Sequence, residues 1–421
     1  MIDASQKIDA CENAVRVLGG GIAGLNCAVH LHRRSIKFQL TEASDGLGGR
    51  MRTDLVDGFR LDRGFQVFQG AYSEAKAALS YDALDLKPVV PGAQVRKGSK
   101  WVRMVDPIRY PSSASSTIFN SIGNLSDRWK LGRLLWDVWR TPMEQLTTAD
   151  GDKSTRELLA VDYSFSESFL KSFMVPWLSG IFLETDLSTS ANFFRFVIKT
   201  LSSGKVYYPQ AGIQAIPNQL AGHLPKDSIE LNRPAKSVQP NFIEFLDGQQ
   251  AAKEVVIAVP MHEASRLVGL PAQDRGSTAT TCIYFAADRP PIAEPILMLN
   301  GEQDGPVNHV FVMTNASTAL APAGKALISV TLIGDVEYAS EAVRSQLQSW
   351  FGSTASDWSE LAVYRILQAL PKQPAGFWTT APTRRLNSIV LCGDYCASAS
   401  LQGALLSGRM AAEQIALGKT G

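Results

Sequence analysis

A glycine-rich turn near the start of the chain has the residue types and the spacing needed to hold a pyrophosphate. Gly19, Gly21 and Gly24 follow an apolar run at 15–18 and precede apolar residues that recur at helical spacing. Gly19 permits a tight turn, Gly21 lets the backbone approach phosphate oxygens, and Gly24 lets a helix pack closely on a strand. The N–H groups at the start of this helix would bind the phosphates.

An acidic residue follows the glycines at the distance that nucleotide binding requires. A second stretch, 37–41, reads as a strand and ends at Glu42, close to the roughly twenty residues by which a ribose-binding acid trails the glycines. The Glu42 carboxylate can accept both hydroxyl protons of an adenosine ribose, and it would repel a 2′-phosphate. The strand, glycine turn, helix, second strand and acid together predict a dinucleotide site rather than a simple chain reversal.

The loop that follows separates the possible dinucleotides. Residues 46–52 read Gly-Leu-Gly-Gly-Arg-Met-Arg, so glycines allow a second close backbone approach while Arg50 and Arg52 add cations. This series resembles the flavoprotein superfamily of amine oxidases, protoporphyrinogen oxidases and carotenoid desaturases, where it holds FAD. The resemblance implies FAD as the cofactor. The residues at 70–72 and 393–395 are most similar to those of plant- and cyanobacterial-type carotene desaturases.

A second cofactor-facing unit is expected near the C-terminus, where an apolar strand leads into Gly393 and Asp394 and then a helical pattern. By resemblance, Asp394 would bind the ribityl or pyrophosphate region, and Val238 would meet the adenine ring. Backbone N–H groups at 402–404 would face the flavin ring at a helix start and favour the negative charge of reduced flavin. The residues expected to bind FAD are Gly19, Gly21, Ile22, Ala23, Gly24, Glu42, Ala43, Gly49, Arg50, Arg52, Val238, Gly393, Asp394, Gln402, Gly403 and Ala404.

Composition excludes several broad classes. The 421 residues suffice for about two domains, and the balance of 41 basic against 40 acidic residues argues against a nucleic-acid partner. Five cysteines form no paired-ligand pattern, which predicts no metal site and is typical of a reducing cytoplasm. No apolar run is long enough to cross a bilayer. Residues 1–13 lack the features of a signal or transit peptide and are expected to form a loose tail.

The motifs predict an α/β fold, with a Rossmann-like FAD-binding domain and an interleaved α+β substrate domain. The FAD-binding domain is expected to be discontinuous, with segments at 14–90, 204–260 and 380–421. The substrate-binding domain would take 91–203 and 261–379. Residues 229–232 and 235–238 read as a strand pair, and apolar stretches at 282–286, 309–313 and 326–332 read as strands of a substrate-domain sheet.

Residues 91–140 differ from the rest of the chain, with nine basic residues against three acids and four of the eight tryptophans. Residues 129–140 form a helical pattern that has basic side chains on one narrow arc and apolar side chains over most of the remainder. The favoured interpretation is a buried helix of the substrate domain whose long basic side chains reach water. The alternative is a peripheral membrane contact through 129–140.

The electron acceptor and the substrate class follow from what the chain lacks. No second GxGxxG turn occurs in a strand–helix context, so we expect electrons to pass to oxygen or a quinone and not to a nicotinamide. In monoamine oxidases a tyrosine of the aromatic cage stands three residues before the glycine of the final Gly-Ala pair, where this chain has Ser400. The strand that carries a flavin-contacting lysine in many amine oxidases corresponds to 280–283, which has none.

The leading prediction is therefore an FAD-dependent oxidoreductase that desaturates an apolar small molecule, isoprenoid or carotenoid-like, or tetrapyrrole-like. Three alternatives stay open: an amine oxidase producing imine and hydrogen peroxide, a redox-neutral flavin-dependent isomerase, and a flavin binder without turnover. Because positioning against the flavin can suffice for hydride removal, no catalytic residue is assigned. The candidate substrate contacts are Tyr208, Trp378 and Tyr395.

Overall fold

The computed structural model describes residues 14–106, 109–110, 120–269, 275–336, 340–378 and 383–418. The expected loose tail at 1–13 lies outside these residues.

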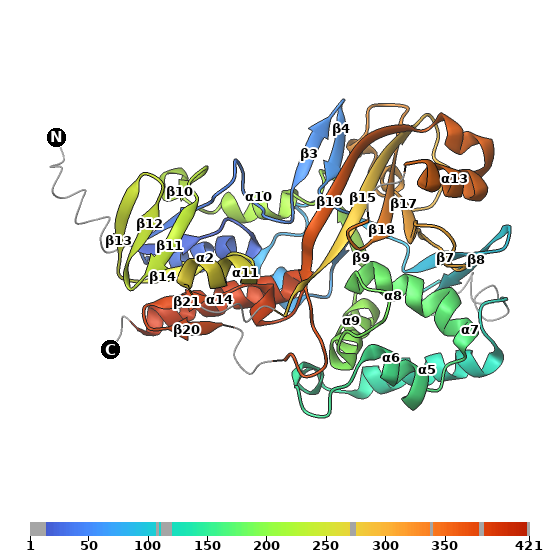
Figure 1. The fold of residues 1–421 in the computed structure, drawn as a ribbon, viewed down its shortest axis with the longest axis horizontal. Coiled ribbons are helices and arrows are strands. Elements are labelled where there is room, and N and C mark those ends of the chain that lie inside the picture. The colour runs from blue at the N-terminus through green and yellow to red at the C-terminus, as the bar shows by residue number, and fades with distance from the viewer. Residues whose placement is uncertain are drawn as a thin grey trace.

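A six-stranded sheet forms the half of the molecule that carries the glycine turn (Figure 1). Neighbouring strands run parallel except at one edge, where β20 pairs antiparallel with β21. The strands, in spatial order, are β10 (Ile229–Glu230), β2 (Phe38–Thr41), β1 (Val15–Leu18), β14 (Val255–Ile257), β21 (Ile389–Leu391) and β20 (Arg384–Leu386). Strands from three distant parts of the chain thus lie side by side, and the predicted α/β, Rossmann-like fold is confirmed.

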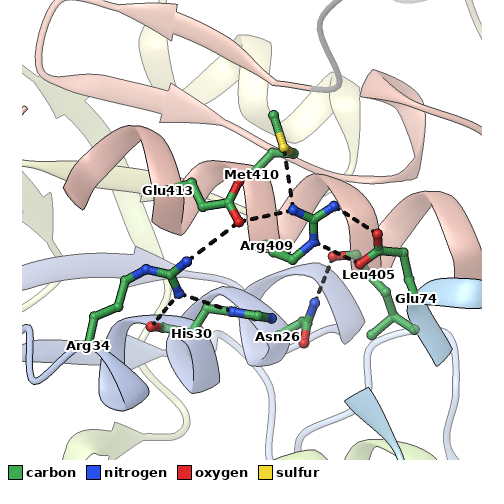
Figure 2. Close-up of polar contacts among 8 residues, drawn as sticks. All are labelled: Asn26, His30, Arg34, Glu74, Leu405, Arg409, Met410 and Glu413. Atoms are coloured by element: carbon green, nitrogen blue, oxygen red, sulfur yellow. Dashed lines mark hydrogen bonds and ion pairs between the residues drawn. The ribbon is translucent and has the colours of Figure 1, made fainter. Parts of the chain in front are cut away.

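Two helices from opposite ends of the chain pack against each other beside this sheet. They are α2 (Ile22–Arg33) and α14 (Leu401–Leu417). A Cβ on Gly408 would lie 2.2 Å from the carbonyl oxygen of Ala23, so only glycine allows the helices to approach so closely. The Asn26 side chain donates to the Leu405 carbonyl at 2.7 Å (Figure 2). This contact fixes the last helix of the chain against the helix that follows the glycine turn.

Charged side chains extend the same contact to α3 (Ser73–Ala78). The Arg409 guanidinium binds both carboxylate oxygens of Glu74, at 2.9 and 2.8 Å, and also binds Glu413 at 2.9 Å (Figure 2). Glu413 in turn lies 3.5 Å from the guanidinium of Arg34 on α2. The bidentate pair with Glu74 is the geometry in which an arginine–carboxylate contact is strongest.

The predicted pairing of 229–232 with 235–238 is wrong. β10 joins β2 in the six-stranded sheet, whereas β11 (Ala235–Gln239) pairs with β12 (Asn241–Phe245), which pairs with β13 (Gly248–Ala252). Asn232 adopts a positive φ of 58°, and the adjacent backbone N–H groups bond to carbonyls of 42 and 44. The link between the two strands is therefore tied to the loop after β2 and does not form a hairpin turn. Helix α11 (Met261–Val268) packs on β11.

A seven-stranded sheet forms the other half of the molecule (Figure 1). Its pairs are antiparallel except for β16 with β7. The expected strands at 282–286, 309–313 and 326–332 are confirmed as members of this sheet. In spatial order the strands are β19 (Ser359–Pro371), β15 (Ser277–Ala287), β18 (Ala326–Ile333), β17 (His309–Val312), β16 (Leu297–Leu299), β7 (Gly92–Lys97) and β8 (Lys100–Val105). The division of the chain into two domains at the stated residues stays a prediction.

The remaining elements surround these two sheets. The short strands are β3 (Thr53–Val56), β4 (Phe59–Asp62), β5 (Phe68–Gln69), β6 (Leu86–Val89) and β9 (Val206–Pro209). The helices are α5 (Leu125–Arg140), α6 (Thr155–Glu157), α7 (Glu167–Phe169), α8 (Val175–Phe182), α9 (Ala191–Ser203), α10 (Ala215–Ala221), α12 (Met313–Ala316) and α13 (Ser340–Phe351). Among the residues that the structure describes, none of the helices is long and apolar enough to span a membrane.

Helix α5 corrects the interpretation of 129–140 as a buried helix. Leu134 and Val138 are buried, but Trp129, Trp136 and Trp139 are exposed over 67%, 55% and 66% of their surface. The apolar arc is too wide for one neighbour to cover: its inner part packs on the protein, and its outer part faces away.

Candidate functional site

The turn between β1 and α2 has the geometry of an anion site. Gly19 has a φ of +105°, and a Cβ there would lie 2.6 Å from the carbonyl oxygen of Ala258. A Cβ on Gly24 would lie 1.9 Å from the Gly19 oxygen. At Gly21, by contrast, a Cβ would meet no atom within 4 Å. Two of the glycines are thus required by the fold itself, while the third borders open space where a ligand can approach.

The start of α2 is open to the same side. Gly21 is the N-cap residue, so no side chain occupies the first N–H groups of the helix, and its first turn, which includes Ile22 and Ala23, carries no acid. These N–H groups and the positive end of the helix dipole favour a bound phosphate.

Glu42 follows β2, and three donors orient its carboxylate. Oε2 accepts the Gly20 N–H at 2.6 Å, and Oε1 accepts the N–H and the hydroxyl of Ser44 at 2.9 and 2.7 Å. A carboxylate has about four acceptor sites, two on each oxygen. Oε1 already accepts two bonds, so Oε2 retains a site for a ribose hydroxyl. Ala43 lies exposed beside it. The carboxylate and the glycine turn are therefore in direct contact.

The Gly-Gly-Arg loop folds onto the glycine turn. A Cβ on Gly49 would lie 3.3 Å from the Gly21 Cα, and Gly49 itself has a positive φ of 58°. Arg50 then reaches the other end of the chain, where its Nη2 lies 2.7 Å from the Asp394 carboxylate. Arg50 was predicted to bind the pyrophosphate and Asp394 the ribityl or pyrophosphate region, and the structure brings the two side chains together. Arg52 instead pairs with Asp45 at 2.7 Å, so its contact with the pyrophosphate stays a prediction.

The segment after β21 is shaped by close contacts. Gly393 has a φ of +154° and donates its N–H to the Ser407 hydroxyl at 2.9 Å. Ser400 caps α14 by accepting the Gly403 N–H at 3.1 Å, and a Cβ on Gly403 would lie 2.1 Å from the Ser398 oxygen. The helix therefore begins at Leu401, and Gln402 to Ala404 lie in its first turn.

The side chain of Gln402 has another task. Its Oε1 accepts the Glu74 N–H and its Nε2 donates to the Ser73 hydroxyl, both at 3.0 Å. The side chain thus caps α3, and only the backbone of Gln402 is left for the predicted flavin contact. Val238 is buried on β11 opposite Ile243, and its contact with adenine stays a prediction.

The three candidate substrate contacts have different surroundings. Tyr208 is fully buried and donates its hydroxyl to Asp62, so it borders no open space. Burial raises the pKa of Asp62 to about 6, against the opposing effect of the Thr53 hydroxyl at 2.6 Å. Tyr395 is also buried, and burial raises the pKa of its phenol. This placement favours a packing role for Tyr208.

Trp378 belongs to an aromatic cluster that sequence reasoning missed. Its ring lies 4.6 Å from Phe377, 6.3 Å from Phe193 and 6.2 Å from Phe196, centroid to centroid. The Trp378 indole Nε1 is buried and lacks a hydrogen-bond partner among the described residues. Phe193 and Phe196 gave only a helical apolar stripe in the sequence, which is also typical of an ordinary core.

Tyr72 connects this cluster to the start of α14. Its ring stacks on Phe196 at 6.3 Å with an interplanar angle of 10°. The Tyr72 hydroxyl hydrogen-bonds the Ser400 side chain, and burial raises the pKa of the phenol. We call Tyr72, Phe193, Phe196, Phe377 and Trp378 the aromatic wall. It borders the helix start that was predicted to face the flavin ring.

The parallel sheet, the glycine turn with the glutamate beside it and the returning Gly-Asp segment define a flavoprotein oxidoreductase. Residues 22–416 match the family model described as flavin containing amine oxidoreductase, so the chain belongs to that family and FAD is its cofactor. The residues of the turn fit this group, since Gly21 and the start of α2 leave room and donors for a pyrophosphate.

Similarity to individual proteins is partial in sequence and extensive in structure. The chain is 41% identical to carotenoid phi-ring synthase of Streptomyces griseus over 71 residues, which is 16% of this chain and 14% of the relative. It is 25% identical to protoporphyrinogen oxidase 2, chloroplastic/mitochondrial, of Arabidopsis thaliana over 179 residues, 42% of this chain and 34% of that protein. The matches thus span about a third of these curated relatives, or less. A crystal structure of an oxidoreductase from Methanosarcina mazei superposes with a TM-score of 0.75 at 16% identity, covering 95% of this chain and all of that one.

Proposed function

We propose that this protein desaturates an apolar small molecule, isoprenoid or carotenoid-like or tetrapyrrole-like, and passes the electrons to oxygen or a quinone. The aromatic wall carries this proposal. Five aromatic side chains contact one another beside the start of α14, and Ser400 stands where a cage tyrosine of monoamine oxidases would be. Trp378 is the partly exposed member of this wall, whereas the other four rings are buried. A flat apolar substrate would therefore gain buried area and ring contacts at Trp378.

Bound FAD supplies the redox chemistry by accepting a hydride from the substrate. The protein would contribute backbone and side-chain groups around the site of hydride transfer. The start of α14 offers backbone N–H groups, and the helix dipole favours negative charge beside it. Trp378 and its neighbours would hold the substrate in a fixed orientation and exclude water, which is the main contribution expected where no acid–base group is needed.

The strand that corresponds to the lysine-bearing strand of many amine oxidases supports the same substrate class. At 280–283 the chain reads Thr-Thr-Cys-Ile within β15, so this strand supplies no lysine. Thr280 donates its hydroxyl to the Leu332 carbonyl at 2.8 Å, and Cys282 lies 3.3 Å from the Ser329 hydroxyl. The polar groups of Thr280 and Cys282 thus contact polar groups of the neighbouring strand β18. The described cysteines are buried thiols and not disulfides, which supports a cytoplasmic setting as part of the proposal.

Anaerobic reduction of the bound flavin, followed by absorbance, tests the proposal. The purified holoprotein is mixed in parallel with carotenoid precursors, porphyrinogens and a panel of amines. Bleaching by a polyene or a porphyrinogen supports the proposal and identifies the substrate class. Reoxidation by a soluble quinone, compared with oxygen, then identifies the acceptor.

Amine oxidation is the second candidate, because the family model that the chain matches is described by amine substrates. In that case amines alone would bleach the flavin, and hydrogen peroxide would form in air. Such a result would overturn the assignment of an apolar substrate while leaving the FAD site unaffected. If no compound in the panel bleaches the flavin, a redox-neutral isomerase becomes the better description.

A further inference from the structure

Helix α5 presents an apolar stripe to the outside of the molecule. Its exposed apolar side chains are spaced by four, seven and three residues, which places them on one face of the helix. Leu125 is 71% exposed and Trp129, Trp136 and Trp139 are 67%, 55% and 66% exposed. Trp136 and Trp139 also contact each other, with ring centroids 5.2 Å apart. We call Leu125, Trp129, Trp136 and Trp139 the tryptophan face.

The opposite side of α5 holds the helix firmly in place. Leu134 and Val138 are buried. Asn124 and Asp127 form a capping box at the N-terminus, and Asp127 also accepts the N–H of Ser166 at 2.8 Å. At the other end, the Lys199 ammonium from α9 binds the carbonyls of 138, 139 and 141. The tryptophan face is thus a fixed surface on a well-anchored helix, and its exposure does not result from a frayed end.

Basic side chains flank this face. Arg133 and Arg140 are both exposed on the same flank. The acid that lies between them on α5, Asp137, is engaged by the Tyr163 hydroxyl at 2.8 Å and by Arg133 at 3.7 Å. The β7–β8 hairpin adds one further cation near the start of α5, since Lys97 donates to the carbonyl of Ser121 at 2.7 Å. The surroundings of the tryptophan face are therefore complementary to negative charge.

We propose that α5 docks the protein on the surface of an anionic phospholipid bilayer. Tryptophan has an apolar ring and a polar N–H, a combination that suits the interface between acyl chains and headgroups. Arginines beside such a face bind anionic headgroups. The helix lies on the membrane and does not cross it: its inner face stays on the protein while the outer face enters the interfacial layer.

A second copy of the chain fits this face less well. A coiled-coil contact prefers aliphatic residues at the repeating positions and needs about three heptads or more, whereas α5 has 16 residues, with three tryptophans and Gly132 in the stripe. Arg133 and Arg140 of two copies would also repel each other. An anionic bilayer gains from the same two charges.

The position of α5 relates the membrane to the aromatic wall. α5 packs on α9, and α9 carries Phe193 and Phe196, which contact Trp378. Docking through α5 would hold this part of the molecule close to a source of apolar molecules. The docking proposal itself depends only on α5 and its flanks, so it can hold or fail independently of the proposed reaction.

Flotation of the FAD-loaded protein with vesicles tests the proposal. Vesicles of phosphatidylcholine alone are compared with vesicles that also contain phosphatidylserine, at low and high salt. We expect the protein to float with the anionic vesicles at low salt. The triple substitution of Trp129, Trp136 and Trp139 by Ser should abolish flotation. R133Q with R140Q should weaken binding about thirtyfold, since each cation near an anionic surface contributes roughly one kcal/mol.

A matched control keeps the test specific. Leu246 and Leu417 are 72% and 73% exposed on other elements, so L246S with L417S removes apolar surface elsewhere and should leave flotation unchanged. FAD content reports that each variant is folded. Brominated lipid should quench tryptophan fluorescence in the unsubstituted protein. Absence of flotation and of quenching would overturn the proposal. So would equal binding to neutral vesicles, or a dimer that is lost in the tryptophan variant without any vesicle binding.

Discussion

The Arg50 guanidinium lies 2.7 Å from the Asp394 carboxylate, although 344 residues separate the two in the chain. The Asp394 side chain is only 9% exposed, whereas that of Arg50 is 39% exposed. This ion pair joins the Gly-Gly-Arg loop to the returning Gly-Asp segment. Two of the predicted cofactor contacts are thereby held in one place before any ligand is considered.

Removing one partner of this pair should weaken FAD binding. A hydrogen bond to a charged group contributes about 1.5–3 kcal/mol, and the exposure of Arg50 places this pair at the lower end. We expect D394N and R50Q each to lower FAD affinity about tenfold, and the double variant to lose less than the sum. Titration of apoprotein with FAD, followed by fluorescence, measures this coupling.

The Arg365–Asp335 pair is the control for that experiment, because both side chains are about half exposed and lie on the seven-stranded sheet and a loop that follows one of its strands. R365Q should leave FAD affinity unchanged. Strict additivity of the two site variants would show that Arg50 and Asp394 act on the cofactor separately.

Substitutions of two glycines in the turn should have different effects, one on FAD binding and the other on stability. A Cβ at Gly21 meets no neighbour within 4 Å, whereas one at Gly24 lies 1.9 Å from a backbone oxygen. G21A should therefore fold as the parent does but retain less FAD, since even a steric cost of about 1.4 kcal/mol lowers affinity about tenfold. G24A should lower the melting temperature of the apoprotein itself.

Thermal unfolding of both apoproteins and FAD retention of both holoproteins provide the measurement. G132A is the control, because Gly132 on α5 also has open space around its Cβ position but lies outside the turn. If G21A kept its FAD, the open space at Gly21 would not be the pyrophosphate site.

Acid stability should depend on His309. Burial lowers the pKa of this imidazole from its ordinary 6.5 to about 3. The unfolded chain therefore binds a proton below pH 6.5 that the folded protein refuses until about pH 3, and the free energy of unfolding falls as the pH falls through this window. The slope from one group is about 1.4 kcal/mol per pH unit. H309Q should lose that slope in denaturant titrations.

Asp62 should change the pH dependence of the free energy of unfolding in the opposite direction to His309. Its pKa is raised to about 6, so its contribution to stability is present below the ordinary carboxyl pKa of 3.8 and is lost as the pH rises through 6. D62N should therefore make the protein more sensitive to acid relative to the parent, whereas H309Q makes it less so. Identical pH profiles for the two variants would contradict both assignments.

Trp378 and Tyr208 should differ in what they affect. W378F keeps an aromatic ring but alters the wall, and we expect it to lower kcat/KM for an apolar substrate with little change in FAD content. Y208F removes the hydroxyl that donates to buried Asp62, which should lower the free energy of unfolding by about 1.5–3 kcal/mol without changing substrate preference. Flavin-reduction kinetics and denaturant unfolding together decide between these roles.

The local patterns of the sequence predicted the glycine turn, the acid at Glu42, most strands of the six-stranded sheet and three strands of the seven-stranded sheet, because each depends on a few adjacent residues. The pairing of strands that are distant in the sequence was harder to predict. Residues 229–230 read as part of a hairpin, yet they join β2 in register with Leu40 and Thr41. Nothing in a local period encodes that partner.

Contacts in the candidate site between residues distant in the sequence could not be predicted from local patterns either. Arg50 and Arg52 are alike in the sequence, but one reaches Asp394 and the other Asp45. The outward tryptophans of α5 and the aromatic wall depend on which face of a helix a neighbour covers. A wheel drawn for α5 alone showed a broad apolar arc and could not show that only its inner part is covered.

The contact between α2 and α14 also sets the order of events during synthesis. The Asn26 side chain and the Leu405 carbonyl, which bond to each other, are 379 residues apart. At the usual rate of translation the chain needs roughly 20–75 seconds to span that distance. During that interval the glycine turn has been synthesised, but β21, Asp394 and α14 have not. We therefore expect FAD to be captured late in synthesis, because Asp394 and α14, which are among its proposed contacts, are made last.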